Sequence, residues 1–237
     1  MKNDKRFAGL LGGGEYDILK EALYYYDDLE KSIADFISKE VKIERNYNLL
    51  EIGIGTGITT AFVLDSLENP ETIKIFAVDN EEKMLNEVKH RFSSVENIEY
   101  VCSDIIEYLK SVEDDFFDGC YSGYVIHNFD FDTRKELFKE LGRTIKSGGF
   151  FVNGDKVVVD DVNMQSDYYD KEIKLYDNLD KIGKTEIKEE WIKHYGEDEK
   201  IRFTEKEQSD ILENNGFTKP EVAFRELMGA VITSKKQ

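Results

Sequence analysis

The stretch LLEIGIGTGITT, residues 49–60, decides the fold, because an apolar run with one acid inside it leads directly into three glycines at alternate positions. Such a run is typical of a buried strand, and the residues after Gly57 favour a helix. A strand that passes straight into a helix brings the helix N-terminus to the carboxyl edge of a sheet, where ligands of open α/β folds bind. Gly53, Gly55 and Gly57 leave the main chain bare there and permit positive φ. We therefore predict a ligand against this turn.

Apolar runs rich in β-branched residues recur along the chain, and amphipathic stretches of helical spacing separate them. The runs cover residues 48–54, 72–79, 97–104, 116–126 and 148–159, and the helical stretches cover 18–36, 56–66, 81–92 and 133–146. This alternation predicts an α/β fold, a Rossmann-like, seven-stranded, mostly parallel sheet with helices on both faces. Gly148 and Gly149 are expected to end the helix before the fifth strand. Two last strands, near 222–224 and 227–232, are expected to close an antiparallel C-terminal hairpin.

The composition of the chain limits the kinds of partner that it is expected to bind. The formal net charge of -18 over 237 residues opposes a phosphate backbone, so we expect no nucleic acid. Cys102 and Cys120 are too few for a disulfide framework and lack metal-ligand spacing. No run approaches the roughly 18 apolar residues of a membrane span, and the start holds only a short apolar stretch. We expect a cytoplasmic monomer or homodimer that binds no metal and no membrane.

The residues around the glycines indicate the kind of ligand. A dinucleotide fingerprint would need a glycine where Ile58 stands, and Glu51 would repel a pyrophosphate but suits a cationic amine. Asp79 ends the second strand, where an acid can accept both hydroxyls of a ribose. Asp104 ends the third strand and can accept from an exocyclic amine. Either aspartate can instead cap the helix that follows it. Amine, ribose and adenine-like groups along one rim favour S-adenosylmethionine over NAD.

Five motifs in order resemble those of class I S-adenosylmethionine-dependent methyltransferases over roughly residues 40–155. They are LLEIGIGTG, FAVDNEEKML, VCSDIIEY, FDGCYSGYVIHNF and LGRTIKSGGFFV. The resemblance implies that Glu51 and the three glycines line the methionine moiety and that Asp79 holds the ribose hydroxyls. Asn80 lies beside Asp79, at a position where many relatives carry another small or polar residue. It further implies cofactor contacts from Tyr16, Met84, Asp104, Ile105 and Ser122.

A sulfonium makes its own methyl group electrophilic, so the protein mainly has to align an acceptor and exclude water. His127, just after the fourth strand, is the candidate base, although related sequences commonly carry a histidine there for loop architecture. His194 is a weaker candidate, and His90 is expected to be solvated. Acceptor-binding candidates are Asp155, whose carboxylate suits an amine, and Tyr168 and Tyr169, whose rings attract cations or simply pack their helix.

We divide the chain into an N-terminal helical cap (1–40), a cofactor-binding α/β core (41–159), a helical insertion (160–203) and a C-terminal helix and hairpin (204–237). The insertion is acidic but carries an apolar stripe at helical spacing, which must cover something. We interpret it as a substrate lid. Thr204 and Glu207 are spaced as a capping box for the last helix, and Gly216 is expected to stop it.

The leading hypothesis is methyl transfer to a small-molecule acceptor. The tail also resembles that of carboxy-S-adenosylmethionine synthases, which bind a modified cofactor and transfer no methyl group. That family carries an arginine where this chain, aligned on Gly216 and Phe217, has Ile211. A nonenzymatic S-adenosylmethionine-binding protein stays open as an alternative. A nicotinamide-dependent oxidoreductase is disfavoured by Ile58 and Glu51.

Overall fold

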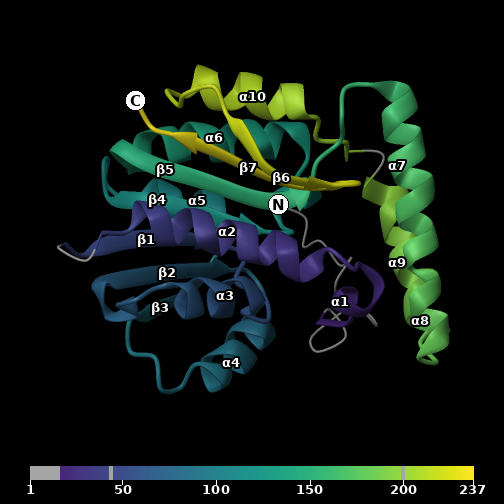
Figure 1. Cartoon of the computed structure of the whole chain (residues 1–237). Coiled ribbons are helices and arrows are strands. Elements are labelled where there is room, and N and C mark those ends of the chain that lie inside the picture. The colour runs from purple at the N-terminus through teal and green to yellow at the C-terminus, as the bar shows by residue number, and fades with distance from the viewer. Residues whose placement is uncertain (1–16, 43–44, 199–200) are drawn as a thin grey trace.

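The computed structural model describes residues 17–42, 45–198 and 201–237, and its centre is one seven-stranded sheet (Figure 1). The strand order is β3-β2-β1-β4-β5-β7-β6. Strands β1 to β5 run parallel, and β7 pairs antiparallel with both β5 and β6. The strands are β1 (Tyr47–Ile52), β2 (Ile73–Asp79), β3 (Ile98–Cys102), β4 (Phe117–Gly123), β5 (Ile145–Lys156), β6 (Glu221–Glu226) and β7 (Gly229–Lys235). The Rossmann-like sheet and its C-terminal hairpin are confirmed.

Helices cover both faces of the sheet, because successive residues of each strand point to opposite sides. Leu49 of β1 packs in the cluster that includes Leu29 and Val63, whereas Leu50 packs in the cluster with Leu109 and Leu137. The helices are α1 (Leu19–Ala22), α2 (Tyr26–Glu40), α3 (Ile58–Ser66), α4 (Glu82–Arg91), α5 (Ile105–Ser111), α6 (Phe131–Thr144), α7 (Val162–Leu175), α8 (Asp177–Lys181), α9 (Thr185–Asp198) and α10 (Glu205–Asn214), with short 3₁₀ turns η3 (Pro70–Thr72) and η4 (Ile126–Asn128).

Two local expectations need correction. The first helical stretch is broken into α1 and α2, with Leu23 extended between them. Helix α6 ends at Thr144 and β5 begins at the next residue, so Gly148 and Gly149 lie inside the strand and do not stop the helix. Gly148, at φ 80°, falls where the pairing of β4 with β5 changes register, which requires a left-handed residue.

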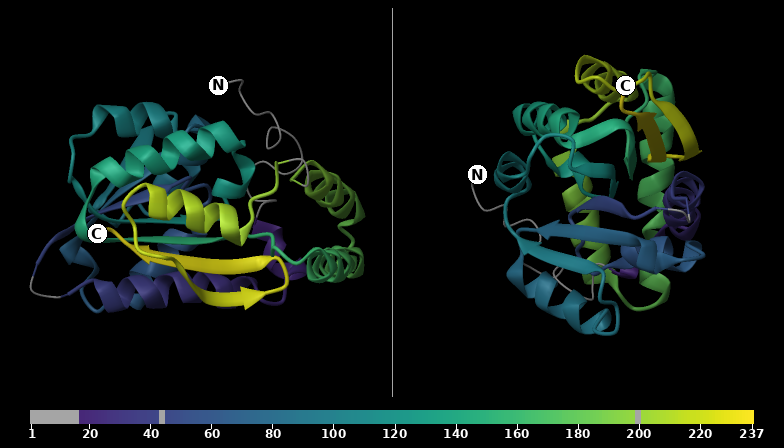
Figure 2. Two further views of the ribbon diagram at one scale, coloured as in Figure 1. Left: turned by 90° about the horizontal axis from the view of Figure 1, so that it is seen from above. Right: turned by 90° about the vertical axis from the view of Figure 1, so that its left-hand side faces the viewer.

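The insertion forms a layer of its own across the carboxyl ends of the parallel strands (Figures 1 and 2). Helices α7, α8 and α9 pack there beside α1, and Asn178 of α8 donates a hydrogen bond to the Ala22 carbonyl at 3.2 Å. The apolar stripe is buried, with Tyr176, Leu179 and Trp191 at most 1% exposed. The insertion therefore covers the same edge of the sheet at which the glycine turn lies.

Candidate functional site

The glycine turn joins β1 to α3, and all three of its glycines have positive φ, at 68°, 52° and 79°. Packing requires two of them, because a Cβ on Gly53 would lie 2.6 Å from Val125 and one on Gly57 would lie 2.5 Å from Phe92. Gly55 differs, since its Cβ would meet only the Met84 methyl group, at 3.9 Å. The backbone at Gly55 is thus the part of the turn that a ligand can approach.

Glu51 lies beneath this turn and is 1% exposed. Its carboxylate accepts hydrogen bonds from Thr60 Oγ1 at 2.6 Å and from the Tyr121 hydroxyl at 3.0 Å. Burial raises the pKa of Glu51 to about 7, against the pull of these two donors. A cation placed beside Glu51 would favour its ionised form, because charges in a buried site interact more strongly than in water.

A second buried acid, Glu30 of α2, lies on the same side of the sheet and was missed from the sequence. Burial raises the pKa of Glu30 to about 8, and the charge of Glu51 adds to that rise, while a hydrogen bond from Thr59 opposes it. Its Oε2 atom is buried without a hydrogen-bond partner. The signal was available, because Glu30 falls four residues from both Tyr26 and Ala34, on the buried face of its helix.

The two rim aspartates bind backbone groups. Asp79 accepts from Gly55 N and from Glu81 N, both at 2.9 Å, so it ties the glycine turn to the start of α4. Burial raises its pKa, and these backbone donors counteract the rise. Asp104 is the N-cap of α5, accepting through Oδ1 from Ile106 N and Glu107 N. The capping role is present at Asp104, whereas Asp79 accepts from the backbone of Glu81, the N-cap residue of α4, and is not itself the cap.

The remaining cofactor candidates differ in how deeply their side chains are buried. Asn80 is exposed, Met84 is half-buried beside Gly55, and Ile105 is buried. Ser122 is fully buried and its hydroxyl donates to the Ile52 carbonyl at 3.3 Å, so its side chain is turned into the sheet. Tyr16 lies outside the described residues.

His127 pairs with Asp155. Its ring Nδ1 lies 2.5 Å from Asp155 Oδ1, and its backbone N–H donates to Oδ2 at 2.9 Å. Asp155, fully buried, also accepts from Lys156 N and Asn153 Nδ2. The Asp155 carboxylate thus binds His127 and backbone and side-chain groups at the end of β5. The sequence had instead suggested that it binds an acceptor amine. Because a carboxylate only accepts, Nδ1 carries the hydrogen and Nε2 is the accepting nitrogen of the neutral ring.

His127 also faces a small cavity of about 20 Å³, room for about one water molecule. Val125, two residues before His127, is the side chain that packs on Gly53. The segment Val125–His127 therefore reaches the glycine turn through Val125 and the cavity through His127. The cavity is lined by His127, Lys156, Val158, Tyr195, Ile201, Arg202, Phe203 and Met228.

The insertion contributes aromatic residues to this region. The His194 ring centroid lies 6.5 Å from that of His127, and the Lys156 ammonium lies 3.9 Å from the centre of the Tyr195 ring. The Tyr195 hydroxyl donates to the buried Glu172, which also accepts from Met228 N at 3.1 Å. Burial raises the pKa of Glu172 to about 7. Glu172 therefore fastens α7 and α9 to the core.

Tyr168 and Tyr169 are half-buried on α7 and pack against the core. Tyr169 lies 6.0 Å from Tyr195, ring centre to ring centre. Tyr195, which contacts Lys156 directly, was not singled out from the sequence.

Arg134 of α6 is 1% exposed and joins His127 to the segment that returns from the insertion. Its guanidinium donates to the carbonyls of Ile126 and His127, at 3.3 and 2.9 Å. It also donates to the carbonyls of Ile201 and Arg202, at 2.5 and 2.9 Å. Because four carbonyls converge on one rigid group, the η4 turn and residues 201–202 move together.

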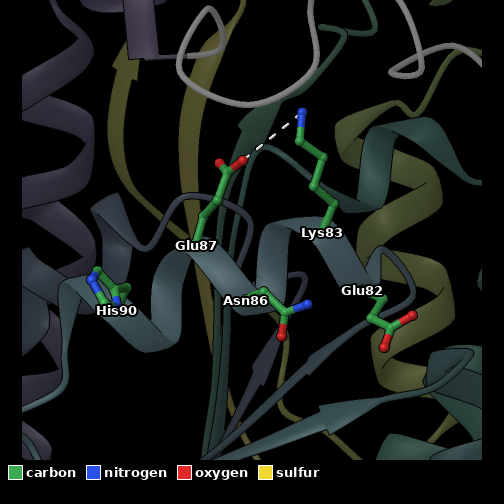
Figure 3. Close-up of a pocket in the computed structure, with 5 residues that line it drawn as sticks. All are labelled: Glu82, Lys83, Asn86, Glu87 and His90. Atoms are coloured by element: carbon green, nitrogen blue, oxygen red, sulfur yellow. Dashed lines mark ion pairs between the residues drawn. The ribbon is translucent and has the colours of Figure 1, made fainter.

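A larger pocket, of about 710 Å³, lies elsewhere, along the outer face of α4 (Figure 3). Its lining residues are Glu82, Lys83, Asn86, Glu87 and His90, with Lys83 and Glu87 paired at 3.9 Å. His90 is exposed there, as expected. All five come from one solvent-facing helix, so the pocket offers no converging catalytic groups. Among the described residues no three His, Cys, Asp or Glu side chains are placed to hold a metal ion.

Residues 50–153 match the family described as "Methyltransferase domain". The chain carries a class I S-adenosylmethionine-dependent methyltransferase domain. Its cofactor is S-adenosylmethionine. The residues present fit a cationic group, because two buried carboxyls, Glu51 in the matched segment and Glu30 on α2, lie on one side of the sheet, and Glu30 Oε2 has no hydrogen-bond partner.

Curated relatives extend the likeness beyond the methyltransferase domain. The carboxy-S-adenosyl-L-methionine synthase of Nautilia profundicola is 22% identical over 221 residues, covering 89% of this chain and 90% of the relative. The synthase of Campylobacter fetus is 25% identical, with 88% and 85% covered. A malonyl-[acyl-carrier protein] O-methyltransferase of Marinomonas is 31% identical over 137 residues, 58% of this chain and 48% of the relative.

Solved structures share the fold. The CurJ carbon methyltransferase aligns with a TM-score of 0.66 at 18% identity over 95% of this chain, which spans 60% of the CurJ chain. A putative methyltransferase from Haloferax volcanii, in complex with the Trm112 activator, aligns with a TM-score of 0.62 at 13% identity over 99% of both chains. Within the described part of the chain, no helix is long and apolar enough to cross a membrane.

Proposed function

We propose that this enzyme transfers the methyl group of S-adenosylmethionine to a small-molecule acceptor, with His127 as the general base. The observation that carries the proposal is the His127–Asp155 pair, which lies two residues from Val125, the side chain that packs on Gly53 of the glycine turn. Asp155 fixes the ring orientation and the tautomer, so that Nε2 accepts a proton, as in other histidine–carboxylate pairs.

The cofactor would be held by the rim residues. The glycine turn, through Gly55, would meet the methionine moiety, with Glu51 and Glu30 supplying negative potential for its ammonium group. Asp79 and Asn80 would contact the ribose, Met84 and Ile105 would flank the adenine, and Asp104 would meet its edge through its second oxygen. Ser122 would act indirectly, by fixing the end of β1 through the Ile52 carbonyl.

When bound, the cofactor supplies an electrophilic methyl group, to which the acceptor donates an electron pair while the carbon–sulfur bond breaks toward sulfur. His127 Nε2 takes the proton that the acceptor loses. Asp155 stabilises the imidazolium that forms, and the buried surroundings keep water from the reacting atoms. The insertion would act as the lid, since α9 brings His194 and Tyr195 to the cavity wall.

The test uses methyl-labelled S-adenosylmethionine and a cell extract freed of macromolecules. We expect label in a small-molecule product, and a loss of about 10²-fold or more in His127→Gln. Calorimetric affinity for S-adenosylhomocysteine, the demethylated product, should stay unchanged in that variant. Binding of the cofactor without transfer of label to any small molecule would contradict the proposal and favour a nonenzymatic cofactor-binding protein.

A carboxy-S-adenosylmethionine synthase-like activity is the second candidate, because the likeness to those synthases covers nearly nine-tenths of both chains. Against it stands Ile211, half-buried on α10, where the resemblance implies an arginine. The two candidates separate by mass spectrometry of the ligand that co-purifies with the protein. A carboxylated cofactor derivative would favour the synthase, whereas S-adenosylmethionine or its demethylated product would favour methyl transfer.

A further inference from the structure

We propose that Asn153 and Gln208 are positioning residues that act on the base through Asp155. The inference rests on the proposed function, in which His127 takes the proton of the acceptor. Asn153 is the last residue of the matched methyltransferase segment, and Gln208 lies beyond that segment, on α10. A helix outside the methyltransferase domain thus contributes to the arrangement of the base.

The first observation is that these polar side chains occupy core positions. Alternate residues of a strand face the same side of a sheet, and Phe151 and Val157 of β5 belong to one buried apolar cluster. Asn153 and Asp155 lie between them on the same face, and both are fully buried. Gln208 of α10 is fully buried as well. Three polar side chains therefore lie where a packed core ordinarily has apolar ones.

The second observation is that Asn153 completes the hydrogen bonding of the Asp155 carboxylate, which offers about four lone-pair sites. Its Oδ1 accepts from the His127 ring at 2.5 Å and from Lys156 N at 2.9 Å. Its Oδ2 accepts from His127 N at 2.9 Å and from Asn153 Nδ2 at 3.4 Å. Each oxygen therefore has two donors, and two of the four donors are side chains, the His127 ring and the Asn153 amide.

The third observation is that Gln208 fixes which way the Asn153 amide points. Asn153 Nδ2 also donates to Gln208 Oε1, at 3.3 Å. A reversed amide would turn its own oxygen toward the acceptor oxygens of Asp155 and Gln208, and both hydrogen bonds would be lost. Gln208 therefore holds Asn153 in the orientation in which it donates to Asp155.

This arrangement has a cost in stability. Asn153 Oδ1 and Gln208 Nε2 are both buried without a hydrogen-bond partner. Such atoms destabilise a fold, whereas leucine or methionine at the same positions would extend the apolar cluster. Stability alone thus gives no reason for two amides at these positions. The hydrogen bonds indicate another reason, which is the orientation of Asp155.

The orientation of Asp155 matters because it sets the tautomer of His127. An ionised Asp155 accepts from Nδ1–H and leaves Nε2 as the nitrogen that takes a proton. A buried carboxylate that loses a donor favours its protonated form. A protonated Asp155 would donate to Nδ1, which places the ring hydrogen on Nε2 and removes the base. Asn153 therefore acts on the reaction without contacting the acceptor.

The experiment reads the tautomer of His127 directly. The chain has three histidines, so selective ¹⁵N labelling of histidine gives a spectrum that is simple to assign. Long-range ¹H–¹⁵N spectra, recorded at a pH at which the rings are neutral, distinguish the two tautomers. We expect the Nδ1–H form of His127 in the wild type.

Asn153→Leu should introduce the Nε2–H form of His127. It should also slow label transfer from methyl-labelled S-adenosylmethionine by about tenfold or more, because that form has no accepting Nε2. Gln208→Met should act in the same direction but more weakly, because Asn153 keeps its contact with Asp155 and loses only its fixed orientation. Calorimetric affinity for S-adenosylhomocysteine should stay unchanged in both variants.

Asn97→Leu is the matched control, because Asn97 Nδ2 also donates to two acceptors, the Pro70 and Ile73 carbonyls, at 2.8 and 2.7 Å. That variant should keep both the tautomer and the transfer rate. The Nε2–H form in the wild type, or an unchanged Nδ1–H form in Asn153→Leu, overturns the inference. Thermal melts are recorded for every variant. If Asn153→Leu does not fold, Gln208→Met decides, and an unchanged tautomer there overturns the inference.

Failure of the two proposals is distinguishable. A tautomer that depends on Asn153, together with no label transfer by the wild-type enzyme, leaves the positioning of His127 standing and removes the methyl-transfer assignment. Label transfer that depends on His127, together with a tautomer that neither variant changes, removes only the positioning role. A changed tautomer with an unchanged transfer rate removes His127 as the base.

Discussion

Glu30 and Glu51 are buried acids with raised pKa values, about 8 and about 7, and burial is the main cause in both. Each of them binds a threonine hydroxyl in the first turn of α3, directly behind the glycine turn. A protein keeps such groups at a cost in stability, which is common where a site needs them. A positive ligand group beside the pair, as the proposed function has it, would offset that cost.

The first prediction concerns Glu30 and pH. Because its folded pKa lies above the unfolded value near 4.5, the folded chain holds more protons than the unfolded chain between about pH 4.5 and 8. Stability therefore falls as pH rises through that window. Glu30→Gln should match the wild type near pH 4 and exceed it by at least about 1 kcal/mol at pH 8, measured by urea unfolding.

The exposed Glu96→Gln is the control for that experiment and should leave the pH profile unchanged. A residual slope in Glu30→Gln is expected from Glu51 and Glu172, which are raised in the same direction. Parallel profiles for Glu30→Gln and the wild type would mean that Glu30 is not buried as an acid.

The second prediction concerns Asp79→Ala. We expect S-adenosylmethionine affinity to fall by at least about 1 kcal/mol, through lost ribose hydrogen bonds and a released Gly55 N–H. Calorimetry measures it. Thr204→Ala removes the cap of α10, whose hydrogen bonds go to Glu207, and should lower stability by a similar amount without changing the affinity. Unchanged affinity in Asp79→Ala would mean that the ribose assignment is wrong.

Helix α6 connects elements that are distant in sequence, since its two arginines bind different partners. Arg134 holds η4 and residues 201–202, whereas Arg143 donates to the Leu109 and Val112 carbonyls at the end of α5. One helix thus joins residues 201–202 to the η4 turn at one end and binds the end of α5 at the other. The two arginines provide a matched pair for testing this coupling.

The third prediction is that Arg134→Met speeds amide exchange at both 126–128 and 201–203, and lowers the rate of methyl transfer. The reason is that four carbonyls lose one shared donor. Arg143→Met should instead speed exchange around 109–114 and spare the His127 turn. Exchange mass spectrometry checks both variants, and loss of protection at only one of the two Arg134 segments would contradict the coupling.

The molecule as a whole is a sheet with its carboxyl edge closed by a helical layer (Figure 1). Glu172 is the point where that layer joins the core, through Tyr195 within the layer and Met228 N in the turn between β6 and β7. This buried acid is therefore one of the contacts that hold α7 and α9 over the cavity, beside the bond from Asn178 to the Ala22 carbonyl. The layer can move only if these bonds exchange or break.

The fourth prediction is that residues 160–198 gain amide-exchange protection when S-adenosylhomocysteine binds, because a lid closes on the occupied edge. Residues 1–17 are expected to behave in the same way. The central strands, already buried, serve as the internal reference. Protection confined to the sheet rim would remove the lid interpretation.

The sequence predicted the features that depend on neighbouring residues. Strands, helices, the Thr204 capping box and the bare glycine turn are local patterns. The resemblance to the methyltransferase family rested on five motifs in order along the chain. Local patterns also predicted that Asp79 and Asp104 lie where a strand ends and the next helix begins. It also predicted the histidine that turned out to face the cavity.

Only the tertiary structure decided which side chains meet. Asp155 and His127 are 28 residues apart, Glu172 and Met228 N 56 apart, and Arg134 reaches carbonyls 67 and 68 residues away. Patterns among neighbouring residues do not encode contacts between residues that are so far apart in the sequence. Burial is decided in the same way, because Glu30, Glu172 and Lys156 become costly or functional only when other elements remove their water. The sequence by itself determined the scaffold and its glycine turn, whereas the packing of distant elements determined which buried charged groups meet.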